Sequence, residues 1–377
     1  MTPAPTQQLG VEAHSHGGDA DGWVAPVQTR SERPWSIDTA AFGDLTTRDP
    51  QWKFANLERI APLIVDARAE AGAVTVTGAE TLPSIASSFR PEDLAAAIAL
   101  KHAAPRHVTV DGTTHVEVVG HGGRALEHIV IDAPAGARGF VVIRHTGTAQ
   151  LLENVEITVG ENADVTIVSV QEWDDTAIHL ASHQASVAAH GRLKHIVVSF
   201  GGGIVRVNPS VALAGEGSDG ELLGLAFADS GQHLESQVFL HHVGRHTRGR
   251  VTYKAALQGA SARTVWVGDV LIGPNATATD SYEQNRNLVL THGARADSIP
   301  NLEIETGDIL GAGHASATGR FDDEQMFYLQ ARGIPEDEAR RLVVIGFLAE
   351  IIAKIGDAEL EARLTAAVEA ELAGGVR

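Results

Sequence analysis

The chain of 377 residues contains no cysteine, few aromatic residues and far fewer basic than acidic side chains. The absence of cysteine excludes a disulfide framework, a thiolate nucleophile, and any zinc or iron–sulfur site held by cysteines of this chain alone. The 29 Lys and Arg against 48 Asp and Glu give a net charge of −19, which disfavours binding to nucleic acids or anionic membranes. No apolar run approaches the roughly 18–20 residues of a membrane span, and the N-terminus lacks signal-peptide features, so we expect a cytoplasmic protein.

The first 35 residues are rich in Pro, Gly, Ala and Thr and predict a disordered tail. His14 and His16 lie near Asp19 and Asp21, but a flexible segment does not preorganise metal ligands, so we expect no metal site there. Residues 36–105 predict a small α/β region. Within it, Pro91-Glu92-Asp93 before LAAAIALKHAA is typical of a helix start.

Residues 106–318 carry short runs of Val, Ile, Leu and Thr bounded by Gly, Asn and Asp, which predict many short strands. A turn followed by a strand recurs at Glu161, His190, Glu216 and Gly244, with further copies near Gly259 and His292. A loose period in the twenties favours a solenoid of parallel β coils, and we interpret it as a right-handed β-helix. A β-sandwich is the alternative, although its hairpins should bring more Asn-Gly and Asp-Gly pairs than Asp111-Gly112.

The 18 histidines raise the question of a metal site. His241 and His242 are adjacent on an expected strand and should point to opposite faces, so they cannot both bind one ion. We interpret these two and the pair His179 and His183 as histidines on a solvated or stacked face. No metalloprotease, Walker A, dinucleotide-binding or nucleophile-elbow motif occurs, and GGGIVRV (201–207) reads as turn glycines before a strand.

Paired carboxylates offer another route to an enzyme, because β-helix proteins include polysaccharide lyases and hydrolases. The visible clusters are Asp174-Asp175 and Asp322-Asp323-Glu324. The second cluster precedes an expected helix, where acidic residues complement the helix dipole. With only 5% aromatic residues the chain is poor in the side chains that carbohydrate clefts use, so a β-helix lyase or hydrolase is the alternative function.

Residues 319–377 predict a helical region. The first helix spans about Asp322 to Ala331, with Met326, Phe327 and Leu329 inside it. The second, from Pro335 to Ile352, is apolar on more than one face, so we expect it to be buried in a core or covered by a partner, with core burial favoured. The last helix carries an i, i+4 apolar stripe made of Leu360, Leu364, Val368 and Leu372.

Three segments carry a resemblance to a known family. They read WKFANLERI from Trp52, NLVLTHGARADSIPNLEIETGD from Asn287, and GHASATGRFDDEQMFYLQARGIPEDEARRLVVIGFLAEI from Gly313. These segments resemble the SufB/SufD family of iron–sulfur cluster assembly proteins. Because SufB-like chains are longer and bring a cysteine for the cluster, this chain resembles the SufD branch.

The resemblance implies a right-handed parallel β-helix flanked by an N-terminal α/β region and a C-terminal helical region. It implies a non-catalytic scaffold that pairs with a SufB-like homologue through the β-helix edges. It further implies that a SufC-like ABC ATPase docks on the C-terminal helices. The resulting SufBCD-type complex would build iron–sulfur clusters and transfer them to apo-proteins.

The resemblance also implies site residues. His314 matches the family's candidate cluster-binding histidine, a transient iron ligand shared with the partner chain, whereas the cysteine of some members is replaced by Ala312. No cofactor is expected to be held by this chain alone. We expect PNLEI (300–304) to close the β-helix and the Gly/Ala-rich segment after it to present His314. The expected ATPase-docking residues are Tyr328, Arg332, Gly333, Ile334, Pro335, Arg340 and Phe347.

Overall fold

The computed structural model describes residues 30, 33–320 and 323–374. Two short 3-10 helices and two α-helices precede or interrupt the first strands: η2 (Thr39–Phe42), η3 (Pro50–Trp52), α1 (Leu57–Ile60) and α2 (Leu94–His102). The strands are β1 (Val74–Thr77), β2 (Glu80–Thr81), β3 (Pro105–Thr109), β4 (Gly112–Ala133), β5 (Arg138–Val159), β6 (Asp164–Trp173), β7 (Ile178–Val187), β8 (Arg192–Ser199), β9 (Ile204–Leu213), β10 (Asp219–Ala228), β11 (His233–His242), β12 (Arg248–Leu257), β13 (Arg263–Ile272), β14 (Thr279–Val289), β15 (Arg295–Ile304) and β16 (Ile309–Arg320). Three helices follow: α3 (Asp323–Ala331), α4 (Glu336–Ile352) and α5 (Ala358–Gly374).

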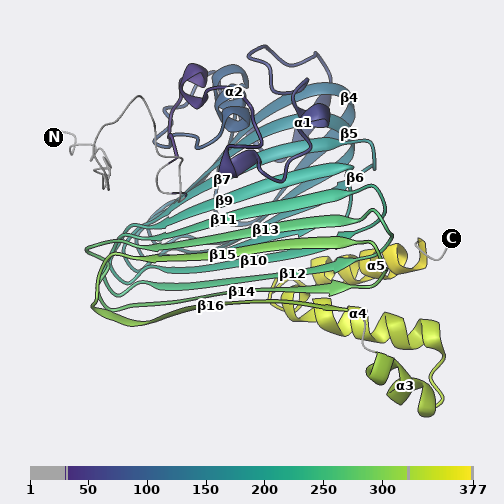
Figure 1. Cartoon of the computed structure of the whole chain (residues 1–377). Coiled ribbons are helices and arrows are strands. Elements are labelled where there is room, and N and C mark those ends of the chain that lie inside the picture. Colours follow the sequence, from purple (N-terminus) through teal and green to yellow (C-terminus); the bar gives the residue numbers. More distant parts are fainter. Residues whose placement is uncertain (1–29, 31–32, 321–322, 375–377) are drawn as a thin grey trace, which may run out of the picture.

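The strands form a parallel β-helix, as the turn spacing predicts. Each strand from β7 to β14 pairs in parallel with the strands two before and two after it, so odd-numbered strands line one wall and even-numbered strands the other. The long strands β4 and β5 run through both walls at the N-terminal end of the stack. Figure 1 shows the coils stacked from β4 to β16, with N-terminal helices near the first coils and C-terminal helices beside the last.

One corner of each coil is built around a residue in the left-handed region of backbone space. These residues are Asn162, His190, Gly217, His246 and Ala278, which are 27 to 32 positions apart. Each amide donates to a carbonyl of the next corner, as from Asn162 N–H to Ala189 O at 3.1 Å. The predicted copies from Glu161 to Gly244 fall on this corner. Those near Gly259 and His292 are wrong as further copies, because they belong to the opposite corner, between β12 and β13 and between β14 and β15.

Alternation along each strand divides its side chains between the lumen and the outer walls. The lumen is filled mainly by Val, Leu, Ile and Ala, which form one continuous core from Ala73 to Val289. Polar side chains interrupt this apolar filling at two places along the lumen, and they form the clusters described below. Burial of the lumen residues therefore fixes the register of every coil, because a slip by one residue would expose them.

The N-terminal region covers the outer face of the odd-numbered wall. Apolar residues of α2, α1 and η3 pack on outward residues such as Leu152 and Leu180. A buried ionic link accompanies them: Asp93 caps α2 through Ala96 N–H and accepts from Arg206 Nη1 at 2.9 Å. Arg206 also pairs with Glu235.

The sequence predicted a solvated tail up to residue 35, but two of its residues behave differently. Arg30 and Arg33 are buried, and Arg30 pairs with Glu92. Arg33 Nη1 donates to Gln237 Oε1 at 3.0 Å on the outer face of β11. The tail prediction therefore does not extend to these two residues. His14, His16, Asp19 and Asp21 lie outside the described residues.

The C-terminal helices α4 and α5 cover the outer face of the even-numbered wall (Figure 1). The predicted apolar stripe of α5 is confirmed, since Leu360, Leu364, Val368 and Leu372 are all buried. In α4 one face is buried through residues such as Val344 and Leu348, in agreement with the favoured core burial. None of the helices in the described ranges is both long and apolar enough to cross a membrane.

Candidate functional site

The β-helix ends in two strands, β15 and β16, that each have a strand neighbour on one side only among the described residues. The expectation that PNLEI closes the β-helix is wrong, because Pro300–Ile304 belong to β15 and a further strand, Ile309–Arg320, follows on the other wall. The Gly/Ala-rich segment is thus itself the last strand. It pairs with β14 over its whole length, with a register shift between Thr279 and Asp280.

His314 lies in the middle of β16, opposite Glu283 of β14. Because paired residues in a parallel sheet point to the same side, both side chains face the lumen. The His314 side chain is 45% exposed, whereas the Glu283 carboxylate is fully buried, and His314 Nδ1 lies 3.8 Å from Glu283 Oε1. Burial, with a smaller contribution from the charge of Asp269, raises the pKa of the Glu283 carboxyl to about 8.

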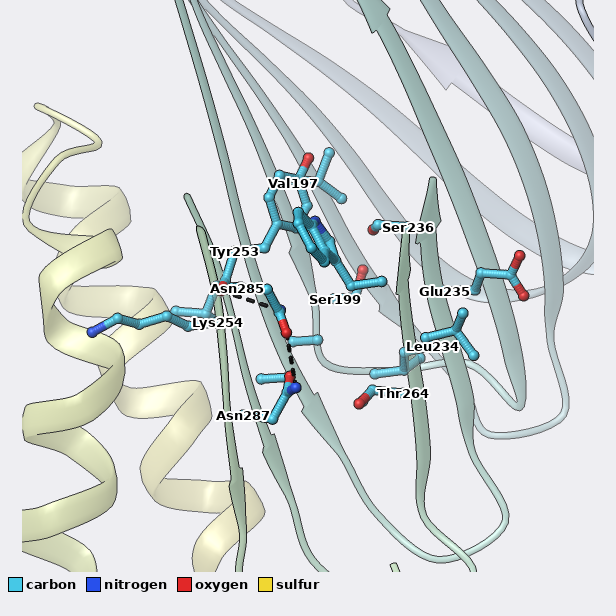
Figure 2. Close-up of a pocket in the computed structure, with 15 residues that line it drawn as sticks. Val197, Ser199, Leu234, Glu235, Ser236, Tyr253, Lys254, Thr264, Asn285 and Asn287 are labelled. Atoms are coloured by element: carbon cyan, nitrogen blue, oxygen red, sulfur yellow. Dashed lines mark hydrogen bonds between the residues drawn. The ribbon is translucent and has the colours of Figure 1, made fainter. Parts of the chain in front are cut away.

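A polar network occupies the lumen next to this pair. Asn287 Nδ2 lies 2.8 Å from Asn285 Oδ1, 2.9 Å from Ser298 Oγ and 3.0 Å from Thr318 Oγ1, so its two N–H groups are shared among acceptors on both walls. Figure 2 shows Asn285 and Asn287 side by side on β14, below Tyr253. A cavity of about 30 Å³ lies among these residues, large enough for a water molecule.

Five of the seven predicted docking residues lie around the turn between α3 and α4. Tyr328 is 55% exposed, and the Arg332 guanidinium lies 4.5 Å from the centre of its ring. Gly333 has a φ of 85°, the left-handed conformation that glycine adopts most readily after a helix. Ile334 is half-buried, and Pro335 is the N-cap of α4.

The other two predicted docking residues face the β-helix. Arg340 Nη1 donates to Leu290 O at 3.2 Å, and Phe347 packs under Lys254, whose Nζ lies 4.7 Å from the ring centre. Beside them an open groove of about 560 Å³ runs between the end of β14, α3 and the start of α4. Phe327 lies within α3, as predicted, and its side chain lines this groove and is 74% exposed.

A second polar cluster, which the sequence interpretation missed, lies in the lumen of the early coils. Glu153 is fully buried between His145 Nε2 at 3.1 Å and His179 Nε2 at 3.2 Å. His183 Nε2 lies 3.8 Å from Glu153 and its Nδ1 lies 3.0 Å from His195 Nε2. The interpretation of His179 and His183 as residues of a solvated or stacked face is therefore wrong, because both are buried in the lumen and the rings of His145 and His179, 4.7 Å apart, are tilted by 42°.

His145, Glu153 and His179 have the spacing of a metal site, but the hydrogen bonds favour another interpretation. Trp173 Nε1 can only donate, and it lies 3.2 Å from His179 Nδ1, so the His179 proton is on Nε2 and points at Glu153. A histidine bound to a metal normally keeps the N–H on its other nitrogen. Burial lowers the pKa of His179 to about 4. For Glu153, burial alone would raise the pKa, but the neighbouring histidines, His145 above all, hold it well below its usual range.

The remaining sequence motifs have structural roles. His241 and His242 point to opposite faces, as predicted, and His242 bonds to Thr247 Oγ1 and Ser281 Oγ inside the lumen. Asp174 accepts from Thr148 Oγ1 and Asp175 from Gln232 Nε2, so neither forms a carboxylate pair. Of the other acidic cluster, Asp322 lies outside the described residues.

Comparison with known proteins gives a consistent result. A family model described as "SUF system FeS cluster assembly, SufBD core domain" matches residues 116–347. A Mycobacterium tuberculosis protein named as an iron-sulfur cluster assembly SufBD family protein is 46% identical over 94% of this chain and 96% of its own length. A Mycobacterium leprae protein with the same family name is 53% identical over 65% of this chain and 64% of its own length.

A second Mycobacterium tuberculosis protein of that family name is similar to a smaller part of the chain. It is 30% identical over 64% of this chain, which corresponds to only 29% of its own length. One bacterium thus has two proteins of this family name that differ in length.

Proposed function

The chain belongs to the SufBD family of the SUF iron–sulfur cluster assembly system, and from this premise we propose that it is the non-catalytic, SufD-like scaffold subunit of a SufBCD-type complex. The complex would assemble clusters and transfer them to apo-proteins, with the cluster as cargo. The observation that carries the proposal is His314, half exposed on the terminal strand of a chain that has no cysteine. Such a chain can supply an imidazole to iron, but the thiolates must come from another protein.

A SufB-like homologue is the partner proposed for the open end. Within the ranges that the structure describes, strands β15 and β16 leave one row each of backbone N–H and C=O groups without a strand neighbour, and such edges pair readily with strands of another chain. Pairing there would place groups of the partner close to His314. The two proteins of this family name in Mycobacterium tuberculosis support a partnership of unequal relatives.

A SufC-like ABC ATPase is the partner proposed for the groove at α3 and α4. Exposed apolar side chains mark interaction surfaces, and Phe327 and Tyr328 are exposed next to each other here. Helix α4 begins at this groove and packs along the even-numbered wall, where Lys254 Nζ donates to Phe347 O at 2.8 Å. A pull on α4 would therefore act directly on the coils that lead to the open end.

Co-expression with a SufB-like homologue and a SufC-like ATPase tests this function, with the affinity tag on this chain. We expect the three proteins to co-purify, and His314→Ala to leave the complex intact while lowering its iron and sulfide content after anaerobic reconstitution. His115→Ala, an exposed histidine of β4 far along the stack, is the control and should match the parent. Failure to co-purify would refute the scaffold role, and a parent-like cluster content in His314→Ala would refute the ligand role.

A further inference from the structure

Glu283 is the least explained titratable group of the lumen. It lies on the inward face of β14, its carboxylate is fully buried, and neither oxygen receives a hydrogen bond. Within the described ranges, its one ion-pair contact within 4.0 Å is His314. A buried carboxylate normally has several donors, because removing it from water without partners is costly. We expect a carboxyl group that is buried without hydrogen-bond donors to bind a ligand.

The wall opposite Glu283 is shaped around the carboxylate. Gly268 of β13 faces it, and a Cβ at that position would lie 2.4 Å from Glu283 Oε2 and equally close to the Trp266 ring. Any larger residue would therefore displace the carboxylate. The absence of a side chain at Gly268 leaves room for Glu283 Oε2, while Oε1 lies on the side of His314, 3.8 Å from its Nδ1.

The distance between the two groups fits a shared cation better than a direct bond. At 3.8 Å, His314 Nδ1 and Glu283 Oε1 are too far apart for a hydrogen bond. Two ligands that each lie about 2.1 Å from one ion are separated by roughly 3 to 4 Å, depending on the angle between them. The observed separation therefore accommodates an ion without movement of the backbone.

Access to this position is open from one side. His314 is on the last strand and 45% exposed, so an ion can approach from the end of the β-helix without crossing the apolar lumen. Imidazole with carboxylate is a ligand set that suits iron, zinc and other divalent first-row metals. Two protein ligands would leave further positions of the ion open to sulfide or to groups of a partner.

We infer that Glu283 and His314 together form a binding site for a divalent first-row metal ion, ferrous iron in the cell, at the open end of the β-helix. This inference rests on the proposed function of His314 and adds Glu283 as the second ligand of the same site. It gives the chain an iron-binding capacity of its own, before any cysteine-bearing partner is present.

Metal titration of the full-length chain tests the inference. Co²⁺, a spectroscopic substitute for ferrous iron, would be titrated anaerobically and followed by calorimetry and by its visible absorption bands. We expect one saturable site in the parent chain and at least about tenfold weaker binding in Glu283→Gln and in His314→Ala, because even loss of a group that only supports a ligand costs 10- to 100-fold in affinity. Glu305→Gln, an exposed carboxylate just after β15, is the matched control and should bind like the parent.

Each outcome of this titration is decisive. Absence of a saturable site in the parent, or parent-like binding by Glu283→Gln, would overturn the inference. Thermal melting of each variant confirms that it is folded, and Glu283→Asp, which keeps the charge on a shorter side chain, should bind more tightly than Glu283→Gln. If the three-protein complex forms and responds to His314→Ala while Glu283→Gln binds like the parent, the proposed function stands and this inference alone fails.

Discussion

Removal of the Asp93 carboxylate should loosen the N-terminal region from the β-helix. Asp93 is 2% exposed and has two roles, since it caps α2 through Ala96 N–H and pairs with the buried Arg206 at 2.9 Å. In Asp93→Ala, Arg206 keeps Glu235 and the carbonyl of Gln51, but it loses one of its two carboxylates.

The expected loss of stability follows from these two roles. Breaking a buried ion pair by removing one partner costs about 3–5 kcal/mol, and the remaining Glu235 contact places Arg206 near the lower end of that range. Loss of the helix cap adds about 1 kcal/mol. We therefore expect Asp93→Ala to lower the free energy of unfolding by about 4 kcal/mol. Asp93→Asn keeps a cap acceptor and should lose about 1 kcal/mol less.

Urea unfolding followed by far-UV circular dichroism measures this effect, and tryptophan fluorescence adds a local signal because Trp52 lies against Arg206, 4.3 Å from ring centre to guanidinium. Asp66→Ala is the control, since it removes an exposed carboxylate that pairs with Lys101 and His102 in the same region, and it should shift the midpoint far less. A loss below about 1 kcal/mol in Asp93→Ala would show that the buried pair contributes little.

Two further predictions concern the lumen. Gly224→Ala should lower the free energy of unfolding, measured in urea, by about 1–3 kcal/mol, because the added Cβ would lie 2.0 Å from the Tyr253 ring. Adding Tyr253→Leu should restore part of this stability. An unchanged unfolding free energy in Gly224→Ala would contradict this packing argument. Acid should destabilise the fold through His242, whose pKa is lowered to about 3 by burial and by His241. Below pH 6.5 this histidine binds a proton in the unfolded chain but not in the folded chain. The resulting loss of unfolding free energy is about 2 kcal/mol at pH 5. Urea midpoints at pH 7 and pH 5 should therefore differ less in His242→Asn than in the parent, and equal differences would exclude this histidine as a source of acid sensitivity.

The sequence was sufficient to predict the parallel coils because corner residues recur at a nearly constant interval. It was insufficient to separate the two corners of each coil, since Gly259 and His292 begin turns of the same composition as Glu161 and His190. Turn chemistry is local, whereas the corner to which a turn belongs depends on its place in the stack.

Of the two polar clusters in the lumen, one could have been predicted from the sequence and the other could not. Glu153 and His179 are 26 residues apart, close to the 28-residue offset at which β5 and β7 pair, so the predicted period could have brought them together. Glu283 offered no such signal, because β14 is polar on both faces and its sequence TDSYEQNRNLV does not reveal which residues face inward. For His314, the resemblance predicted a residue presented to a partner, and the edge position of β16 became evident only in the fold.

The two ends of the β-helix differ in a way that limits assembly. At the C-terminal end β15 and β16 are 10 and 12 residues long, and neither has an outer neighbour in the part of the chain that the structure describes. At the other end the stack finishes in β1 and β2, antiparallel strands of only 4 and 2 residues, which offer little to pair with. The chain thus offers one long strand edge for end-to-end association. Two such β-helices can join by these edges, but the joined pair presents no second long edge, so the association stops at the dimer and does not grow into a filament.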